Sequence, residues 1–269
     1  MLISYDRQFI FFHVTKAAGT SVKKALDSYA QEPEKFKIAR PPREVDGAPN
    51  SFYEMWESML WHAKARDAQK ELSPDIYDRF YKFAFVRNPW DWQVSYYHFI
   101  LKEGDHIRHE QVKAMTGGFE EYLEWVIATK NPFPKGATKL QADIITHKSG
   151  QLIVDYVGRY ETLNQDFERV CQRLGLAVSL PHLNQSQHRD YRNYYNDRTR
   201  QLVADHFQQD IDLFGYTFEG YDLHGGQIGE ISDHPLNANP IQSGTVSMVM
   251  PTITDIPAVT QMSTVASSA

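Results

Sequence analysis

Four residues near the start of the chain, Lys16, Gly19, Thr20 and Ser21, have the types and the spacing of an anion-binding site. Lysine supplies a mobile positive charge, and the two hydroxyl groups donate hydrogen bonds. Glycine has no side chain, so a ligand can approach the backbone closely. We therefore predict that this stretch binds a phosphate or a chemically similar anion.

The flanking sequence predicts the elements that position these residues. Residues 9–14 form an apolar run rich in aromatic residues, which is typical of a buried strand. Ala17 and Ala18 complete a loop of small residues, and a helical pattern begins at Thr20 or Ser21, either of which can be the N-cap. The first turn of such a helix presents unpaired N–H groups and the positive end of the helix dipole to an anion.

The order of these residues argues against a loop that binds nucleoside triphosphates. Such a loop reads G-x-x-x-x-G-K-[ST], with the lysine after the second glycine. In this chain Lys16 precedes Gly19, and no glycine comes before Lys16 in the loop. We therefore do not expect a standard ATP- or GTP-hydrolysing loop.

A second pair of residues, Arg87 and Ser95, follows another predicted strand at residues 81–86. Arg-Asn-Pro closes that strand, and Asp91 is a candidate cap for the helix that carries Ser95. Arginine offers a planar fork of donors and serine offers a short hydroxyl group. The two side chains together suit one phosphate group.

These two motifs, in this order, resemble the sulfotransferases that use PAPS (3′-phosphoadenosine 5′-phosphosulfate). The resemblance covers residues 8–220 and is closest to the carbohydrate branch of the family, as a soluble bacterial- or viral-like member. It implies an α/β, P-loop-like three-layer fold in which helices flank a central parallel sheet. It also implies that residues 16–21 bind the 5′-phosphosulfate, and that Arg87 and Ser95 bind the 3′-phosphate.

Further residues are assigned through this resemblance. In the family, a loop near residues 181–195 closes over the nucleotide, and its binding candidates here are Asn184, Ser186, Arg189 and Tyr194. Without the resemblance these residues would be interpreted as a surface loop. No metal is expected, since the sequence has no cluster of His and Cys ligands.

The expected reaction is the in-line transfer of a sulfuryl group from PAPS to an acceptor hydroxyl, with Lys16 at the leaving phosphate. His62 lies between the two motifs and is the expected catalytic base, with His13 and His98 as rivals. A glycan is the preferred acceptor. The alternatives are a small-molecule or lipid hydroxyl, a nucleotide- or polyanion-binding module without turnover, and a kinase.

The composition limits the kinds of partner that the protein can bind and indicates its cellular compartment. The net charge of −6 over 269 residues argues against a general nucleic-acid binder. Cys171 is the only cysteine, so no disulfide forms within the chain, and we interpret it as a core residue in a protein of the reducing cytosol. No stretch approaches about 18 apolar residues, and no basic region precedes an apolar run at the N-terminus. We therefore expect no membrane anchor, no secretory signal and a cytoplasmic location.

The chain divides by composition into residues 1–224, the predicted sulfotransferase domain, and residues 225–269. The second part has no lysine, arginine or aromatic residue, and we interpret it as a flexible C-terminal tail. Residues 102–118 form a loop of positive character that either faces the acceptor or is solvated. We interpret Trp125, within a predicted amphipathic helix, as a core residue rather than a platform for a sugar ring.

Overall fold

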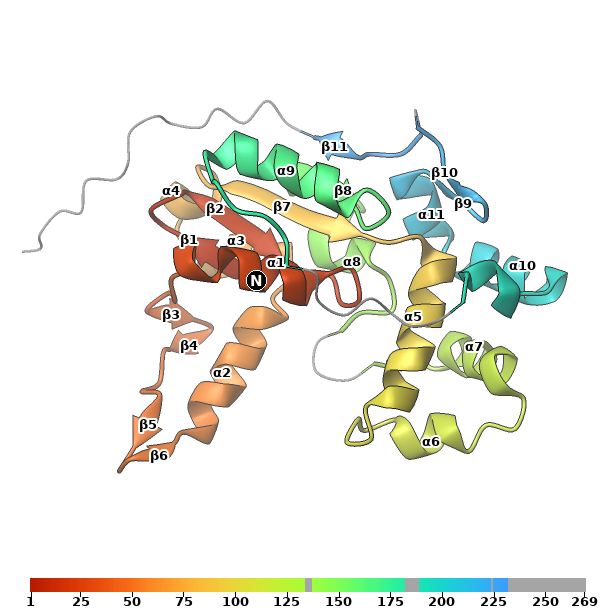
Figure 1. Cartoon of the computed structure of the whole chain (residues 1–269). Helices are drawn as coiled ribbons and strands as arrows, with labels where there is room; N and C mark the ends of the chain where they lie inside the picture. Colours follow the sequence, from red (N-terminus) through yellow and green to blue (C-terminus); the bar gives the residue numbers. More distant parts are fainter. Residues whose placement is uncertain (134–136, 182–188, 224, 232–269) are drawn as a thin grey trace, which may run out of the picture.

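Three buried strands form the centre of the fold. They are β2 (Phe9–Phe12), β7 (Tyr81–Val86) and β8 (Tyr156–Arg159), and they pair in parallel in the order β2–β7–β8. The computed structural model of the chain describes four stretches, residues 1–133, 137–181, 189–223 and 225–231. Figure 1 shows the sheet lying between helices on both of its faces.

Two short strands complete the sheet at its edges. β1 (Leu2–Ser4) lies antiparallel to β2, and β11 (Gly229–Glu230) lies antiparallel to β8. Only residues 5–8 separate β1 from β2, and so short a connection can join only antiparallel strands. The α/β class and the flanking helices are therefore confirmed, but the expected parallel sheet is a mixed one.

The side chains of β2 alternate between the two faces of the sheet, because successive residues of a strand point in opposite directions. Phe9 and Phe11 pack in one core cluster with apolar residues of α1 (Gly19–Leu26) and α9 (Leu163–Leu174). Ile10 and Phe12 pack in a second cluster on the opposite face. This alternation produces three layers.

The remaining helices lie either on the second face or beyond the carboxyl ends of the strands. Those that contribute to the second cluster are α2 (Ser51–Trp61), α3 (Ala65–Glu71), α4 (Pro74–Tyr77), α8 (Ala142–Ile145) and α11 (Gln208–Phe214). A third apolar cluster, separate from the sheet, joins α5 (Pro89–Lys102), α6 (His109–Lys113), α7 (Gly118–Ala128) and α10 (Asp197–His206). This helical part forms one side of the molecule in Figure 1.

The last parallel strand begins later than its apolar residues suggest. Residues 153–157 are predicted as a strand, whereas β8 covers Tyr156–Arg159. The offset has a local cause at Asp155, whose N–H donates to the carbonyl oxygen of Lys82 at 2.7 Å. The Asp155 carboxylate also lies 2.8 Å from the Lys82 ammonium, and both side chains are buried. This pair fixes the register at which β8 joins β7.

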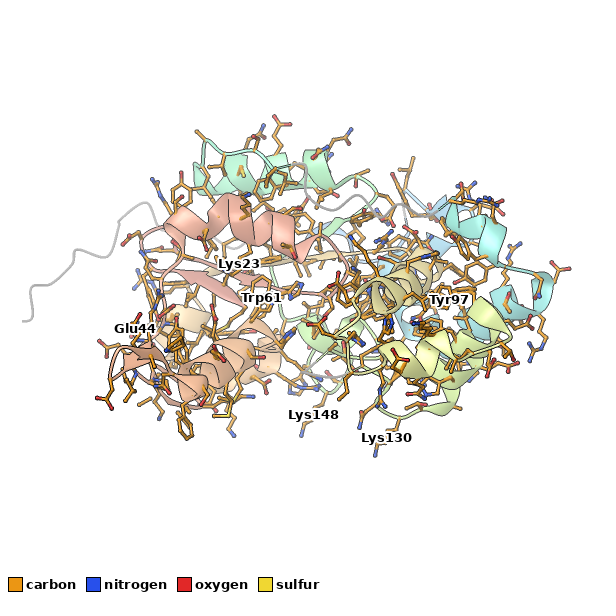
Figure 2. The ribbon with its side chains drawn as sticks, turned by 60° about the horizontal axis from the view of Figure 1, so that its bottom comes forward. Lys23, Glu44, Trp61, Tyr97, Lys130 and Lys148 are labelled. Atoms are coloured by element: carbon orange, nitrogen blue, oxygen red, sulfur yellow. The ribbon has the colours of Figure 1, made fainter. Side chains whose placement is uncertain are left out.

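Two small hairpins follow the short 3-10 helix η1 (Asp27–Tyr29) and precede α2. Their strands are β3 (Lys35–Phe36), β4 (Ile38–Ala39), β5 (Glu44–Val45) and β6 (Ala48–Pro49). Figure 1 shows them projecting from the body of the molecule beside α2, and Figure 2 places Glu44 at the side opposite to Tyr97 of α5. A third hairpin, of β9 (Tyr216–Thr217) and β10 (Gly220–Tyr221), follows α11.

The sheet continues past residue 224, where composition placed the end of the domain. Ile231 donates its N–H to the carbonyl oxygen of Asp155 at 2.7 Å, directly after β11. The hydroxyl of Tyr81 donates to the Glu230 carboxylate at 2.8 Å. The folded part therefore extends to at least residue 231.

We expect a chain that ends at residue 224 to melt at a lower temperature than one that ends at residue 231, because only the longer chain retains β11. The hydrogen bonds lost are worth about 2–3 kcal/mol in total, which corresponds to roughly 5–10 °C for a chain of this size. Thermal unfolding of the two truncations by circular dichroism measures the difference. Equal melting temperatures would show that β11 adds no stability.

Candidate active site

The carboxyl ends of the three parallel strands meet at one edge of the sheet. Phe12 of β2 pairs with Ala84 of β7, and Val86 of β7 pairs with Arg159 of β8. The segments that follow the strands therefore lie side by side. In strand order they are residues 13–21, Arg87 and residues 160–163. In parallel α/β sheets, ligands bind at this edge.

The loop after β2 turns through two residues in the left-handed conformation. Lys16 has a φ of 65° and Ala18 a φ of 63°, which costs a non-glycine residue about 1–2 kcal/mol. α1 begins directly afterwards at Gly19, and no side chain caps it. The expectation that Thr20 or Ser21 is the N-cap is therefore wrong. Because no side chain occupies the helix start, its first N–H groups face a concave turn suited to an anion.

Two aromatic neighbours fix this loop in place. The indole N–H of Trp92 donates to the carbonyl oxygen of Thr15 at 2.7 Å. The imidazole of His13 lies against Gly19, where an added Cβ would stand only 1.8 Å from the His13 Cδ2 atom. Any side chain at position 19 would therefore displace His13, so the loop requires glycine here.

The Arg87 side chain joins the two motifs directly. Its Nε donates to the Asp91 carboxylate at 2.7 Å, and its Nη1 donates to the carbonyl oxygen of Lys16 at 3.2 Å. The guanidinium carbon also lies 4.0 Å from the centroid of the Tyr160 ring. Arg87 is buried, so its charge is held in one position by contacts from α5 and from the segments that follow the two neighbouring strands.

The backbone of Arg87 is held by a buried amide. Its N–H donates to Gln141 Oε1 at 2.8 Å, and its carbonyl oxygen accepts from Gln141 Nε2 at 2.7 Å. The backbone N–H groups of Gln141 and Ala142 in turn donate to the carboxylate of Asp210, each at 2.8 Å. Burial raises the pKa of Asp210 to about 7, although these two hydrogen bonds oppose the shift. A chain of buried polar groups, from Asp210 through Gln141, thus fixes the backbone of Arg87.

Asn88, the residue after Arg87, caps α5. Its Oδ1 accepts from the N–H of Trp90 at 3.1 Å, so the expectation that Asp91 is the cap is wrong. Asp91 binds Arg87 instead. The N–H of Asn88 donates to Glu161 Oε1 at 2.7 Å. Burial raises the pKa of Glu161, and the bond from Asn88 opposes that shift.

A cavity of about 1170 Å³ lies over these loops. The predicted site residues that line it are Lys16, Ala18, Gly19, Thr20, Ser21, Arg87 and Ser95. The Ser95 hydroxyl is buried and has no hydrogen-bond partner in the part of the chain that the structure describes. Because buried polar groups are normally paired, this hydroxyl marks a place that a bound ligand oxygen would satisfy.

The ammonium of Lys16 lies in the same cavity, 4.1 Å from the centroid of the Phe99 ring. The pKa of Lys16 is lowered to about 8, mainly by burial and also by the positive charges of Arg87 and Lys102. Glu103 acts in the opposite direction. Lys16 is therefore a cation whose charge is easily lost above neutral pH.

Three of the other predicted nucleotide-binding residues, Ala17, Arg189 and Tyr194, do not line the cavity. The N–H of Ala17 donates to the carbonyl oxygen of Val14 at 3.2 Å, and its methyl group is buried in the core. Arg189 is exposed, and Tyr194 lies in the 3-10 helix η2 (Tyr191–Tyr194). Asn184 and Ser186 lie outside the described residues.

The three candidate histidines occupy different positions. His13 lines the cavity, and its buried Nδ1 finds no hydrogen-bond partner within the described stretches. His62 is the C-cap residue of α2; its ring centroid lies 5.9 Å from that of His13, but the ring is not part of the cavity lining. His98 lines the cavity, and its Nε2 lies 2.7 Å from the Tyr194 hydroxyl.

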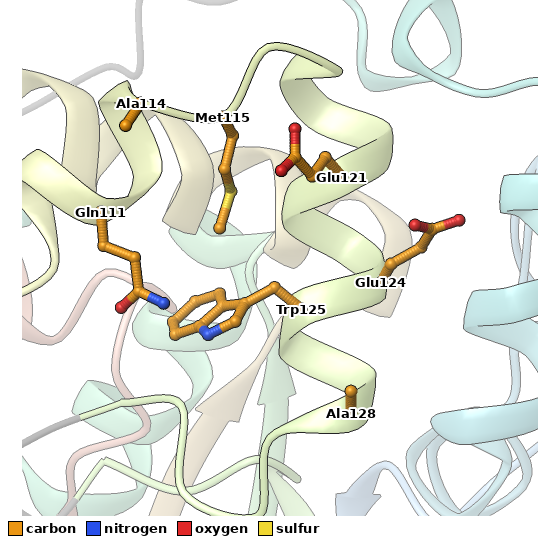
Figure 3. A pocket seen from close by; sticks show the side chains of 7 residues that line it. All are labelled: Gln111, Ala114, Met115, Glu121, Glu124, Trp125 and Ala128. Carbon is orange, nitrogen blue, oxygen red and sulfur yellow. The ribbon is translucent and has the colours of Figure 1, made fainter.

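A second, smaller hollow of about 520 Å³ lies between α6 and α7. Figure 3 shows the Trp125 indole facing Gln111 and Met115 there. Trp125 is half-buried and packs against the third apolar cluster, so it lies at the margin of the core rather than inside it. The Arg108 guanidinium already lies 5.7 Å from its ring centroid. Cys171, by contrast, is buried in the core as expected, and burial raises the pKa of its thiol to about 11.

Several residues that shape the site were not predicted. Asp91, Tyr160, Gln141 and Asp210 all hold Arg87 directly or through one neighbour. Each lies in a segment whose local pattern indicates only a helix or a turn. The one available signal was charge, since Asp91 follows Arg87 at the i+4 position of an expected helix start.

Two features are absent from the described stretches. None of their helices is long and apolar enough to cross a membrane. Nowhere in the same stretches do three or more His, Cys, Asp or Glu side chains gather as metal ligands would.

Comparison with known proteins gives one match over most of the chain. The family model described as "Sulfotransferase family" matches residues 1–217. An uncharacterized protein of Archaeoglobus fulgidus is 29% identical over 114 residues, which are 42% of this chain and 82% of that protein. No solved structure matches the chain.

The buried His13 predicts a loss of stability in acid. Burial is the largest cause that lowers its pKa well below 6.5, so below that pH the unfolded chain binds a proton that the folded chain does not. The stability is thus complete above pH 6.5 and is lost as the pH falls, by about 1.4 kcal/mol at pH 5.5. Urea unfolding at pH 7.5 and 5.5 measures this loss.

The substitution His13→Gln should remove that part of the pH dependence, whatever it does to stability at pH 7.5. The matched control is His147→Gln, at an exposed histidine, which should keep the wild-type dependence. An unchanged difference between the two pH values in His13→Gln would contradict a neutral, buried His13.

Proposed function

The chain belongs to the sulfotransferase family, and on this premise we propose that it transfers a sulfuryl group from PAPS to a hydroxyl group of an acceptor, with a carbohydrate as the preferred acceptor. One observation carries the proposal. The lysine loop and the Arg87–Ser95 pair line the same cavity, and Arg87 donates a hydrogen bond to the Lys16 carbonyl oxygen at 3.2 Å. Two anion-binding groups within one cavity suit a donor with anions at both ends.

The residues present fit such a donor. The start of α1 has no side-chain cap, and the turn before it is concave, as a 5′-phosphosulfate would require. The unpartnered Ser95 hydroxyl and the fixed guanidinium of Arg87 suit the 3′-phosphate. Because Arg87 is already oriented, little side-chain entropy is lost when it binds an anion.

In the proposed reaction, the acceptor oxygen forms a bond to sulfur while the bond from sulfur to the phosphate oxygen of the donor breaks. The acceptor proton passes to a histidine, and the negative charge that develops on the phosphate is stabilised by Lys16 and the first N–H groups of α1. The products are the sulfated acceptor and 3′-phosphoadenosine 5′-phosphate (PAP). The protein acts mainly through position and charge.

For the base we propose a member of the pair His13 and His62, whose ring centroids lie 5.9 Å apart. His62 is the candidate from its position in the sequence, and His13 is the member that lines the cavity. Burial holds His13 in the neutral form that a base needs, but the same lowered pKa makes it a weaker proton acceptor than an ordinary histidine. His98 remains the third candidate because it also lines the cavity.

The carbohydrate acceptor is supported by the polar character of the cavity beyond the loops. Lys102, Glu103, Asn164 and Gln165 line it, and such side chains hydrogen-bond to hydroxyl groups. A small-molecule or lipid hydroxyl is the second candidate, and a binding module without turnover is the third. Incubation of labelled PAPS with panels of glycans, small alcohols and lipids, read by mass spectrometry, distinguishes the three.

We expect Ser95→Ala to weaken PAP binding by about ten- to a hundredfold while stability stays equal or rises. The hydroxyl has no hydrogen-bond partner among the described residues, so its removal should cost the fold little, whereas a hydrogen bond to a charged phosphate is worth about 1.5–3 kcal/mol. Arg87→Ala should weaken binding more, but it also removes the contacts to Asp91 and Lys16. Calorimetry with PAP, and with ADP as a ligand that lacks the 3′-phosphate, measures both.

The comparison between the two ligands decides whether Ser95 lies at the 3′-phosphate. If Ser95→Ala weakens PAP and leaves ADP unchanged, the assignment holds. Equal losses of affinity for PAP and ADP would place Ser95 at a part of the nucleotide that both ligands share. Wild-type affinity for both ligands would show that Ser95 does not bind the nucleotide.

We expect the loss of the base to lower kcat about 10²-fold or more, the usual scale for a positioned base, while PAP binding and melting temperature stay near wild type. The variants are His62→Ala, His13→Gln and His98→Ala, and His147→Ala is the control at an exposed position. Turnover is measured with an acceptor from the screen at saturating PAPS. Near-normal kcat in both His62→Ala and His13→Gln would transfer the role to His98 or to a carboxylate.

A further inference from the structure

The ammonium group of Lys16 has an aromatic partner rather than an acidic one. Its Nζ atom lies 4.1 Å from the centroid of the Phe99 ring, within the range of a cation–π interaction. It makes no ion pair and no hydrogen bond with any residue of the described stretches. Phe99 follows Ser95 by one turn of α5, and both side chains line the cavity.

The ring itself is held from the other side. His106, in the segment after α5, meets Phe99 edge to face, with ring centroids 5.6 Å apart. His106 donates its N–H to the carbonyl oxygen of Glu103 at 2.9 Å, and its Nδ1 accepts from the N–H of Arg108 at 3.1 Å. These contacts fix the ring on which the ammonium rests.

Three acidic residues line the cavity with Lys16, but none of them forms an ion pair with it. Asp91 binds Arg87, and Glu161 accepts from Asn88. Glu103 raises the pKa of Lys16 without forming an ion pair. The charged and titratable groups that face Lys16 are His13 of the segment after β2, Arg87, Asp91, His98, Lys102 and Glu103 of the β7–α5 segment, and Glu161 after β8.

We infer that Phe99 is a positioning residue for Lys16, because its ring holds the ammonium in the cavity as a cation without an ionic partner. An anionic donor then has no ion pair to break when it binds, whereas a lysine paired with Glu103 would have to exchange one carboxylate for another anion. The placement of the Lys16 ammonium against the Phe99 ring follows from the contacts alone. The benefit to sulfuryl transfer rests on the proposed function.

The test begins with the titration of Lys16 in the donor-free protein. Competitive acetylation over a range of pH, read by peptide mass spectrometry, reports the fraction of each lysine that is deprotonated. In the wild-type protein Lys16 should titrate near pH 8. Phe99→Leu keeps the site apolar but removes the negative ring face, so the midpoint should fall by about 0.5–1 pH unit. Lys148, which is exposed, is the control within the same digests and should not change.

Two further variants separate the ring face from packing. Phe99→Tyr keeps an electron-rich face and should restore the wild-type midpoint. Site-specific replacement of Phe99 by phenylalanines with increasing numbers of ring fluorines weakens that face with little change of shape, and should lower the midpoint stepwise. An unchanged Lys16 midpoint in both Phe99→Leu and the fluorinated series would overturn the inference, even if activity fell.

Enzyme kinetics are then measured on the same series of Phe99 variants. The alkaline limb of kcat/KM for PAPS reports the free enzyme, so it should move to lower pH with the Lys16 midpoint, and kcat should fall about tenfold in Phe99→Leu. A limb that stays in place while the midpoint moves would show that Lys16 is held by Phe99 but does not limit transfer. If no acceptor is sulfated by the wild-type protein, the proposed function fails, and the acetylation measurement still decides the role of Phe99.

Discussion

The parallel pairing of β2 with β7 is the constraint on which the site depends. With Phe12 opposite Ala84, the segments that leave the two strands are close enough for Arg87 to donate to the Lys16 carbonyl oxygen. A slip of one residue would exchange the two faces of a strand. It would turn the small Ala84 toward the aromatic cluster and would misplace Arg87 against the loop. The strand register that packs the sheet is therefore also the register that positions the site.

The site is organised from its least accessible side. The side chain of Arg87 has partners on Asp91 and Tyr160, while Gln141 and Asp210 hold its backbone. The entropy of ordering these groups is lost when the chain folds, not when a ligand binds. Around this fixed centre, the Ser95 hydroxyl and the Lys16 ammonium have no polar side-chain partner among the described residues. The groups that fix Arg87 thus form a rigid frame around the Ser95 hydroxyl and the Lys16 ammonium.

Sequence reasoning reached the elements with strong local patterns and missed those set by distant contacts. The apolar runs of β2 and β7, and the break between α2 and α3 near Trp61, follow from composition and periodicity. The left-handed turns at Lys16 and Ala18 do not, because neither residue type favours them. Gln141 and Asp210 hold each other although 69 positions separate them, and no local pattern records that contact. The two residues of β11, glycine and glutamate, carry no strand signal at all.

The brevity of the outer strands has a consequence for how the protein behaves in concentrated solution. A long, flat edge strand offers a row of unpaired backbone groups onto which another chain can add, and this is a common start of aggregation. β1 has three residues, and part of its outer side is already covered, since Gln31 donates its N–H to the Ile3 carbonyl oxygen at 2.8 Å. β11 has only two residues. Within the described chain, the sheet therefore presents little template for growth at either margin, and its three aromatic-rich parallel strands stay shielded between them.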